Sequence, residues 1–246
     1  PPFSGKKAKT IIEKSLHQPI EAIFSEFDLQ ALASASIAQV HAARLHNGDS
    51  VVIKVLRPNI RKLIDQDIGV LLSLAKMAEY WSSEAKQLKP RQLILEVAQT
   101  LHDELDLMRE AANASQLKRN FKNSSLVHVP KIYWEFTHPH VMVMERIHGV
   151  PIHDIEQLRR RRVDMKKLAE RGIELFFTQI FRDSYFHADL HPGNIFVCVT
   201  DPNNPTYIIV DFGIVGSLNQ HDQRYLAENL LAFFKRDYQR VAELHI

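Results

Sequence analysis

The spacing of hydrophobic residues near the start of the chain predicts one helix. Over residues 6–16, apolar side chains recur at three- and four-residue intervals at Ala8, Ile11, Ile12 and Leu16. This spacing is typical of an amphipathic helix, because it places the four side chains on one face. Pro19 is expected to end that helix, since proline cannot continue the backbone hydrogen-bond ladder.

From Phe27 the pattern changes and favours strands. Residues 37–45 and 50–55 are rich in Val, Ile and Ala, and Asn47-Gly48 lies between them as a hairpin turn signal. We predict three strands before about residue 55. Two helices are predicted next, over residues 58–81 and 90–121, each with a proline near its first turn.

The remaining pattern alternates between strands and helices. Strands are predicted over residues 129–134 and 140–144, and again over 195–199 and 207–210, where the turn-forming residues 201–205 join the last two. A helix is predicted over residues 164–182, and we expect its apolar stripe to lie in the core. That stripe consists of Leu168, Ile173, Phe176, Phe177 and Ile180. A final helix is predicted over residues 225–246. Because the helical spacing of its apolar residues continues up to Ile246, we expect the chain to be part of a longer protein.

This order of elements predicts an α+β fold with two lobes. The first lobe, residues 1–145, would hold a small antiparallel sheet with inserted helices, and the second, residues 146–246, would be mainly helical. The chain has 246 residues and a formal net charge of +2, so its charge indicates no nucleic-acid partner. The single cysteine, Cys198, excludes an internal disulfide and suits a reducing compartment. The longest apolar stretch, residues 68–78, is interrupted by Lys76 and falls short of the roughly 20 residues of a membrane-spanning helix.

The motif HADLHPGN at residues 187–194 carries the clearest chemistry. Asp211, followed by Phe212 and Gly213, comes 17 residues after Asn194. A short hairpin between Asn194 and Asp211 would bring two oxygen ligands together, as Mg²⁺ on a nucleotide requires. Asp189 lies five residues before Asn194, where it could accept a proton from, or orient, an attacking hydroxyl group or water.

The two histidines of this motif raise a zinc alternative. His187 and His191 are four residues apart, but Pro192 and Gly193 make a helix there unfavourable. We expect the imidazoles to hydrogen-bond backbone and carboxylate groups that hold the loop in shape.

A lysine at the end of a predicted strand suggests a phosphate-binding group. Lys54 closes the sequence VVIK, and an inward-pointing lysine needs negative partners, which ATP phosphates and a helix glutamate would supply. The candidates are Glu104, Asp106 and Glu110. Glu110 is chosen because it lies near the edge of a face that we expect to be buried, marked by Leu105, Met108 and Ala112.

Two further segments are expected to contact the nucleotide. The segment before Lys54 is rich in Ala and Ser and lacks glycine, so its backbone could approach phosphates but should be stiffer than a glycine-rich loop. Its candidate contact residues are Leu32, Ala33, Ser34, Ala35, Ser36, Ile37, Ala38 and Val40. A hinge near Glu145 and Ile147 would present backbone groups to adenine. The arginines at residues 159–162 are expected to form a solvated turn, with an anionic lipid surface as the alternative.

With these residues in view, the sequence resembles the UbiB family of atypical kinase-like proteins, which support ubiquinone (coenzyme Q) biosynthesis. The segment ASASIAQVH at residues 33–41 resembles the alanine-rich loop of the family. Glu104-Leu-Asp106 resembles its E-x-D motif, and residues 186–196 and 211–216 resemble its catalytic and metal motifs. The resemblance covers essentially the whole chain.

The resemblance implies a protein-kinase-like fold and an ATP- and Mg²⁺-dependent activity. It implies that Lys54 and Glu110 form an ion pair, that Asp189 is catalytic, and that Asn194 and Asp211 hold Mg²⁺. ATP hydrolysis linked to ubiquinone synthesis would be the activity, and only a few residues separate Gly213 from the last helix, which leaves no room for a long peptide-docking segment. The expected partners are ubiquinone-biosynthesis proteins or isoprenoid quinone precursors.

Two elements of the family are not found in this sequence, an upstream K-x-G-Q segment and a hydrophobic C-terminal membrane tail. The family role of Glu104 and Asp106 is tied to that upstream segment. We therefore expect a fragment of a protein located at the cytoplasmic side of the bacterial inner membrane. Two alternatives stay open, a small-molecule phosphotransferase of the aminoglycoside or choline kinase type, and a scaffold that binds nucleotide without turnover.

Overall fold

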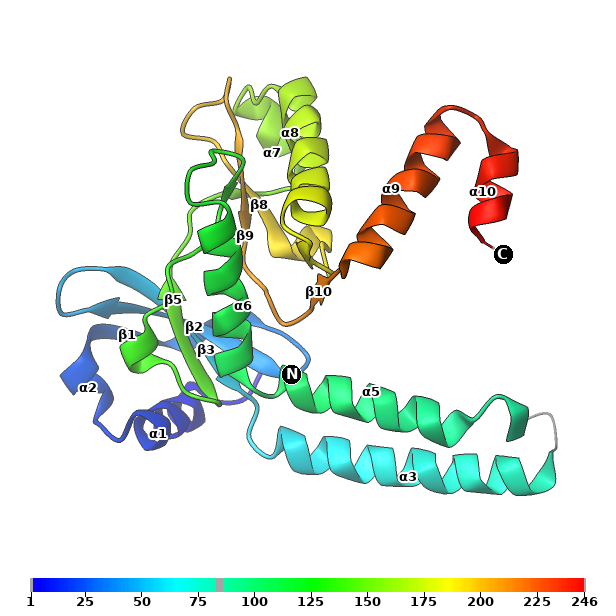
Figure 1. The fold of residues 1–246 in the computed structure, drawn as a ribbon. Helices are drawn as coiled ribbons and strands as arrows, with labels where there is room; N and C mark the ends of the chain where they lie inside the picture. Colours follow the sequence, from blue (N-terminus) through cyan, green and yellow to red (C-terminus); the bar gives the residue numbers. More distant parts are fainter. Residues whose placement is uncertain (1, 83–85, 246) are drawn as a thin grey trace. The chain divides into compact units, whose positions relative to one another are not determined.

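The structure is a computed structural model that describes residues 2–82 and 86–245 (Figure 1). It divides into two compact units. The first comprises Pro1–Ala112 and Lys131–Arg146, and the second comprises Asn113–Pro130 and Ile147–Ile246. The compact units therefore group residues 113–130 with the second half of the chain, whereas the sequence prediction divided the chain once, after residue 145.

The first unit is built on a four-stranded antiparallel sheet. Its strands run in the order β1 (Phe24–Ser34), β2 (Ala38–Leu45), β3 (Ser50–Leu56) and β5 (Val141–Glu145). The three strands predicted before residue 55 and the strand predicted over residues 140–144 are confirmed. Helices α1 (Gly5–Leu16) and α2 (Ile20–Ile23) cover one face, and the predicted first helix is confirmed with Ser4 as its cap.

The alternation of side chains in β3 decides where its lysine points. Val51, Ile53 and Val55 belong to the core cluster that includes Ile12 and Leu16 of α1. Because successive side chains of a strand point to opposite faces, Lys54 lies on the face of the sheet that α1 does not cover. Lys54 is paired in register with Val40 of β2 and Met142 of β5.

The predicted helix over residues 90–121 is wrong in its continuity. The chain forms α5 (Pro90–Glu104) and α6 (Leu107–Asn120), separated at Leu105 and Asp106. The break arises because the Asp106 carboxylate accepts a hydrogen bond from the Met108 N–H at 3.0 Å, which caps a new helix rather than extending the old one. The helix predicted over residues 58–81 is present as α3 (Ile60–Trp81).

Helices α3 and α5 lie side by side as an antiparallel pair (Figure 1). Ala75 and Ala98 are buried, whereas several large apolar side chains of the pair are exposed, among them Val70, Leu74 and Met77. Among residues 2–82 and 86–245, no helix is both long and apolar enough to cross a membrane.

The strand predicted over residues 129–134 is largely wrong. The structure has a two-residue strand, β4 (Val127–His128), an isolated bridge from Ile132 to Met144, and a 3₁₀ turn over Trp134–Phe136. Pro130 lacks a backbone N–H, so it cannot donate to a ladder that would join these pieces.

The second unit contains two small sheets. The four-stranded sheet has the order β4, β9 (Thr206–Ile209), β8 (Ile195–Cys198) and β6 (Val150–Pro151), in which only the β4–β9 pairing is parallel. A two-stranded sheet pairs β7 (Tyr185–His187) with β10 (Val215–Ser217). The hairpin predicted from the strands at 195–199 and 207–210 is therefore confirmed as β8 and β9.

The helices of the second unit depart from prediction at two places. Besides residues 113–120 of α6, they are α7 (Ile155–Arg160), α8 (Met165–Phe177) with a π-helical turn at Thr178–Arg182, α9 (Gln220–Phe234) and α10 (Tyr238–Leu244). Leu168 and Ile180 are buried as predicted, but Ile173 is 60% exposed and Phe176 is 47% exposed, so the predicted stripe is only partly core. The predicted final helix is interrupted because the Asp237 carboxylate caps a separate α10 by accepting from the Arg240 N–H.

Candidate functional site

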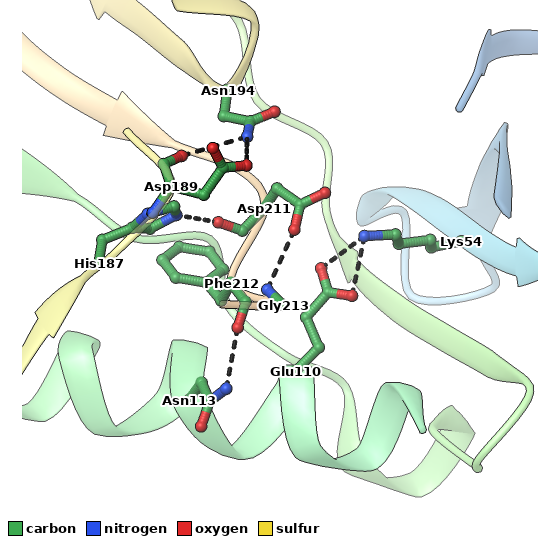
Figure 2. A network of polar contacts seen from close by, with 9 residues as sticks. All are labelled: Lys54, Glu110, Asn113, His187, Asp189, Asn194, Asp211, Phe212 and Gly213. Atoms are coloured by element: carbon green, nitrogen blue, oxygen red, sulfur yellow. Dashed lines mark hydrogen bonds and ion pairs between the residues drawn. The ribbon is translucent and has the colours of Figure 1, made fainter. Parts of the chain in front are cut away.

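Lys54 and Glu110 form a buried ion pair within the first unit. The Lys54 ammonium group donates to both carboxylate oxygens of Glu110, at 2.7 and 2.8 Å, and the two side chains are only 9% and 4% exposed (Figure 2). Glu110 lies in the first turn of α6, where the helix dipole stabilises a negative charge. The structure thus pairs the predicted lysine with the predicted glutamate.

The other two acidic candidates lie elsewhere. Glu104 ends α5, and Asp106 caps α6 through its bond to the Met108 N–H. The buried apolar residues of α6 are Leu107, Ala111, Ala114 and Leu117. Of the predicted Leu105, Met108 and Ala112, only Leu105 is buried. The break at Asp106 explains this difference, because it resets the helical phase.

The alanine-rich segment forms the turn between β1 and β2. Leu32, Ala33, Ser34, Ala35 and Ser36 are exposed, Ile37 and Val40 are partly buried, and Ala38 is buried. The Ala35 N–H donates to the Ala38 carbonyl at 2.9 Å, which closes the turn.

Arg57, which was not predicted from the sequence, stabilises this turn by hydrogen bonds from a residue outside it. Its guanidinium donates to the Ala35 carbonyl at 3.1 and 2.9 Å and to the Ser34 hydroxyl at 2.9 Å, and its backbone N–H donates to the Ile37 carbonyl at 2.8 Å. The feature of the sequence that could have pointed to Arg57 was its position directly after β3, three residues beyond Lys54.

The predicted hinge residues are placed at the end of β5. The Glu145 N–H donates to the Lys131 carbonyl at 2.8 Å, and the Glu145 carboxylate accepts from the Lys131 N–H at 2.9 Å. Ile147 follows in an irregular segment and is partly buried. Since the Glu145 N–H is engaged, an adenine contact at this residue would rely on another backbone group.

The β8–β9 hairpin brings Asn194 and Asp211 to one end of the second unit. Ile195 is paired with Ile209, and the Val210 N–H donates to the Asn194 carbonyl at 3.2 Å. The two candidate metal ligands therefore flank the same open end of the hairpin, as the sequence predicted. The Asp211 carboxylate accepts from the Gly213 N–H at 3.0 Å, which orients it within its loop.

His187 links the loop of Asp189 to the backbone of Asp211. Its Nδ1 accepts from the Asp189 N–H at 3.1 Å, and its Nε2 contacts the Asp211 carbonyl oxygen (Figure 2). Because an amide N–H only donates and a carbonyl only accepts, the imidazole carries its proton on Nε2. His191 accepts from the Gly193 N–H at 3.1 Å. These bonds confirm the backbone part of the prediction made for the two histidines.

Asp189 is exposed and oriented by its own motif. The Asn194 amide nitrogen donates to the Asp189 carboxylate at 3.3 Å (Figure 2), while the Asp189 carbonyl accepts from the His191 N–H at 2.8 Å. Since Nδ2 of Asn194 faces Asp189, its Oδ1 points away and is disposed to bind a cation.

The donor set fits Mg²⁺ better than zinc. An amide oxygen from Asn194 and a carboxylate from Asp211 are hard oxygen donors, and Mg²⁺ on a nucleotide needs few protein ligands because phosphates and water complete its shell. Within the described part of the chain, no group of three or more His, Cys, Asp or Glu residues is arranged to hold a metal.

Three polar residues support this region and were missed by sequence reasoning. The Gln179 side chain accepts from the His187 N–H at 2.9 Å. The Asn113 amide donates to the Phe212 carbonyl at 2.9 Å, and the Tyr185 hydroxyl donates to the Asn113 side-chain oxygen at 3.0 Å. The signal for Asn113 was a residue of low helix propensity in the middle of a helical segment.

Comparison with known proteins identifies the family of this sequence. The ABC1 atypical kinase-like domain matches residues 1–245. Over all 246 residues, the chain is 58% identical to a probable protein kinase UbiB of Marinobacter nauticus and 57% identical to that of Pseudomonas putida. The match covers 100% of this chain but 45% and 46% of those relatives, so the chain spans about half of their length.

Among solved structures, the chain is similar to Rv3197 from Mycobacterium tuberculosis, which was solved in complex with erythromycin. The TM-score is 0.74 at 25% sequence identity, and the match covers 99% of this chain and 60% of Rv3197. The domain match and this likeness confirm the predicted α+β, kinase-like fold.

Proposed function

This chain belongs to the ABC1 family of atypical kinase-like proteins, and from that premise we propose that it binds ATP with Mg²⁺ and hydrolyses it or transfers its terminal phosphoryl group. The observation that carries this proposal is the buried Lys54–Glu110 pair. Burying two charges is costly, and such a pair is weak evidence for stability alone. A functional reason for keeping it is the binding of nucleotide phosphates, which the lysine performs in kinase-type sites.

We assign the first unit the task of holding the nucleotide. Lys54 would contact the α- and β-phosphates, with Glu110 fixing the position of its ammonium group. The turn between β1 and β2 would cover the phosphates through backbone N–H groups. Glu145 and Ile147 would border the adenine.

We assign the second unit the metal ligands and the catalytic carboxylate. Asn194 and Asp211 would hold Mg²⁺, which when bound neutralises charge on the phosphates. Asp189 would accept a proton from, or orient, the attacking hydroxyl group or water, and its exposure leaves it accessible for that role. His187 keeps Asp189 and Asp211 in a fixed relation through its two ring nitrogens.

The biological setting is proposed from the names of the relatives. Because those proteins are named UbiB, we propose that the activity supports ubiquinone biosynthesis at the cytoplasmic side of the bacterial inner membrane. Ubiquinone-biosynthesis proteins or isoprenoid quinone precursors would be its partners. Glu104 and Asp106 are proposed to contact a segment of the longer protein, as the resemblance of Glu104-Leu-Asp106 to the E-x-D motif of the family implies.

The proposal is tested by replacing the catalytic carboxylate without changing its shape. Asp189→Asn is expected to lower Mg²⁺-dependent release of ADP by at least about 100-fold, as expected for the loss of a general base, while ATP binding persists. Asp201→Asn, in an exposed turn of the same unit, is the matched control and should leave the rate unchanged. A wild-type protein that fails to bind ATP with Mg²⁺ would end the proposal.

The same experiment separates the two alternatives. Unchanged ADP release in Asp189→Asn, together with full complementation of a ubiquinone-deficient strain, would favour a scaffold without turnover. A screen with labelled ATP addresses the other alternative, because stoichiometric appearance of one phosphorylated metabolite would favour a small-molecule phosphotransferase.

A further inference from the structure

A polar connection within the second unit joins helix α6 to the loop of Asp211. Asn113 lies in the middle of α6, and its side-chain amide nitrogen donates to the carbonyl of Phe212 at 2.9 Å (Figure 2). The two residues are 99 positions apart in sequence. Asparagine disfavours a helix interior, so a side chain placed there and directed at another backbone segment calls for an explanation.

The orientation of the Asn113 amide is determined by its two partners. The Phe212 carbonyl can only accept, so Nδ2 of Asn113 must face it, and Oδ1 is left to accept from the Tyr185 hydroxyl at 3.0 Å. Burial raises the pKa of Tyr185 above its ordinary value, with a smaller opposing effect from Arg119. The hydroxyl is therefore protonated across the physiological range and is available as the donor.

The Asp211 loop is held at three successive points by different elements. His187 of β7 contacts the Asp211 carbonyl, Asn113 of α6 holds the Phe212 carbonyl, and the Ala188 N–H donates to the Ile214 carbonyl at 3.1 Å. Two of these three contacts come from β7 or the residue after it. Asn113 supplies the third from a helix, and Tyr185 of β7 in turn orients Asn113.

We infer that Asn113 is a positioning residue for the metal ligand Asp211, with Tyr185 setting the orientation of its amide. This inference rests on the proposed Mg²⁺·ATP function. Asn113 itself would touch neither metal nor nucleotide. It acts by holding the peptide that follows Asp211, so that the carboxylate meets Mg²⁺ without first ordering the loop.

The test uses Asn113→Asp, which keeps the acceptor for Tyr185 but removes the donor to Phe212. The Mg²⁺ concentration for half-maximal binding of an ATP analogue is expected to rise by about tenfold, the equivalent of one hydrogen bond. Binding of the nucleotide without metal should change by less than about twofold, since only the metal ligand is disturbed. A variant that weakens binding equally with and without Mg²⁺ would overturn the inference.

The matched control is Asn120→Asp at the end of the same helix. Oδ1 of Asn120 accepts from Gln116, and the same atom remains in aspartate, so the half-saturating Mg²⁺ concentration should not move. If Asn113→Asp does not fold, Tyr185→Phe takes its place, because it frees the amide while keeping the Phe212 bond. It should raise the half-saturating Mg²⁺ concentration by about threefold, and no rise would overturn the inference.

A second measurement distinguishes failure of this inference from failure of the proposed function. Without nucleotide or metal, hydrogen exchange at the amides of residues 212–216 is expected to be about tenfold faster in Asn113→Asp than in wild type or Asn120→Asp. Unchanged exchange overturns the positioning role even if wild-type protein binds Mg²⁺·ATP. If exchange is faster in the variant but the wild-type protein binds no nucleotide, Asn113 does order the loop of Asp211. The proposal that this order serves Mg²⁺ binding would then be refuted.

Discussion

The Lys54–Glu110 pair allows a quantitative test of how charge is buried in the first unit. The experiment is a double-mutant cycle. Each single variant removes one partner, Lys54→Met or Glu110→Leu, and the double variant removes both. The ammonium group lies 2.7 and 2.8 Å from the two carboxylate oxygens, and both side chains are almost inaccessible to water. Each single variant takes an oppositely charged partner away from a buried charge and is expected to lower the free energy of unfolding by about 3–5 kcal/mol.

The double variant is expected to recover most of that loss. Methionine and leucine fill similar volumes without charge, so the protein should be within about 2 kcal/mol of wild type, or more stable. The coupling energy between the two positions would then be at least about 4 kcal/mol. Loss of ATP binding in the double variant, despite its recovered stability, would separate the functional reason for the pair from its effect on folding.

Urea unfolding followed by tryptophan fluorescence measures this cycle in the relevant unit. The only tryptophans in the sequence, Trp81 and Trp134, both belong to the first unit. Arg44→Met is the matched control, because Arg44 and Glu26 form an exposed pair at 3.5 Å that should be worth less than about 1 kcal/mol. Single variants as mild as this control, or a double variant as damaging as the sum of the two, would refute the reasoning.

The pKa of Tyr133 and the packing of Gly172 give two further predictions. Burial, followed by the hydrogen bond to Asp49, raises the pKa of Tyr133 to about 12, so between pH 10 and 12 the unfolded chain loses a proton that the folded protein keeps. Stability should therefore fall by on the order of 2 kcal/mol across this window, and Tyr133→Phe, compared by urea unfolding at each pH, should lack that part of the fall. A Cβ at residue 172 would lie 2.5 Å from the Tyr207 hydroxyl, which donates to a backbone carbonyl. Gly172→Ala is expected to cost about 1–3 kcal/mol by calorimetry, whereas Gly69→Ala, in open space within α3, should be neutral or stabilising.

Local patterns predicted the parts of the fold that depend on local interactions. The hairpin around Asn47-Gly48 and the β8–β9 hairpin form as expected, because turn residues and β-branched runs act over a few positions. The break between α5 and α6 was not predicted, because apolar residues continue through it without glycine or proline. Asp106 was the available signal, since aspartate is a preferred helix cap.

Contacts between distant residues could be predicted only where chemistry demanded a partner. A lysine on a buried strand face requires a negative charge, and this requirement led to Glu110 across 56 residues. The bond from Asn113 to Phe212 has no such requirement, because an amide can be satisfied by water or by many backbone groups. For the same reason, the carbonyl partners of Arg57 could not be identified from the sequence.

The turn between β1 and β2, which we propose to cover the nucleotide phosphates, forms without glycine. Among the described residues, those with positive φ lie outside residues 32–38, so the turn is made entirely from conformations that alanine and serine adopt readily. Such a turn gives up the close, flexible approach of a glycine-rich loop, and its shape is fixed by bonds from Arg57 instead. Arg57 follows Lys54 by three residues along the chain, beyond the end of β3. The end of β3 that carries Lys54 is therefore followed directly by the residue that sets the shape of this turn, and a shift of this segment would affect both.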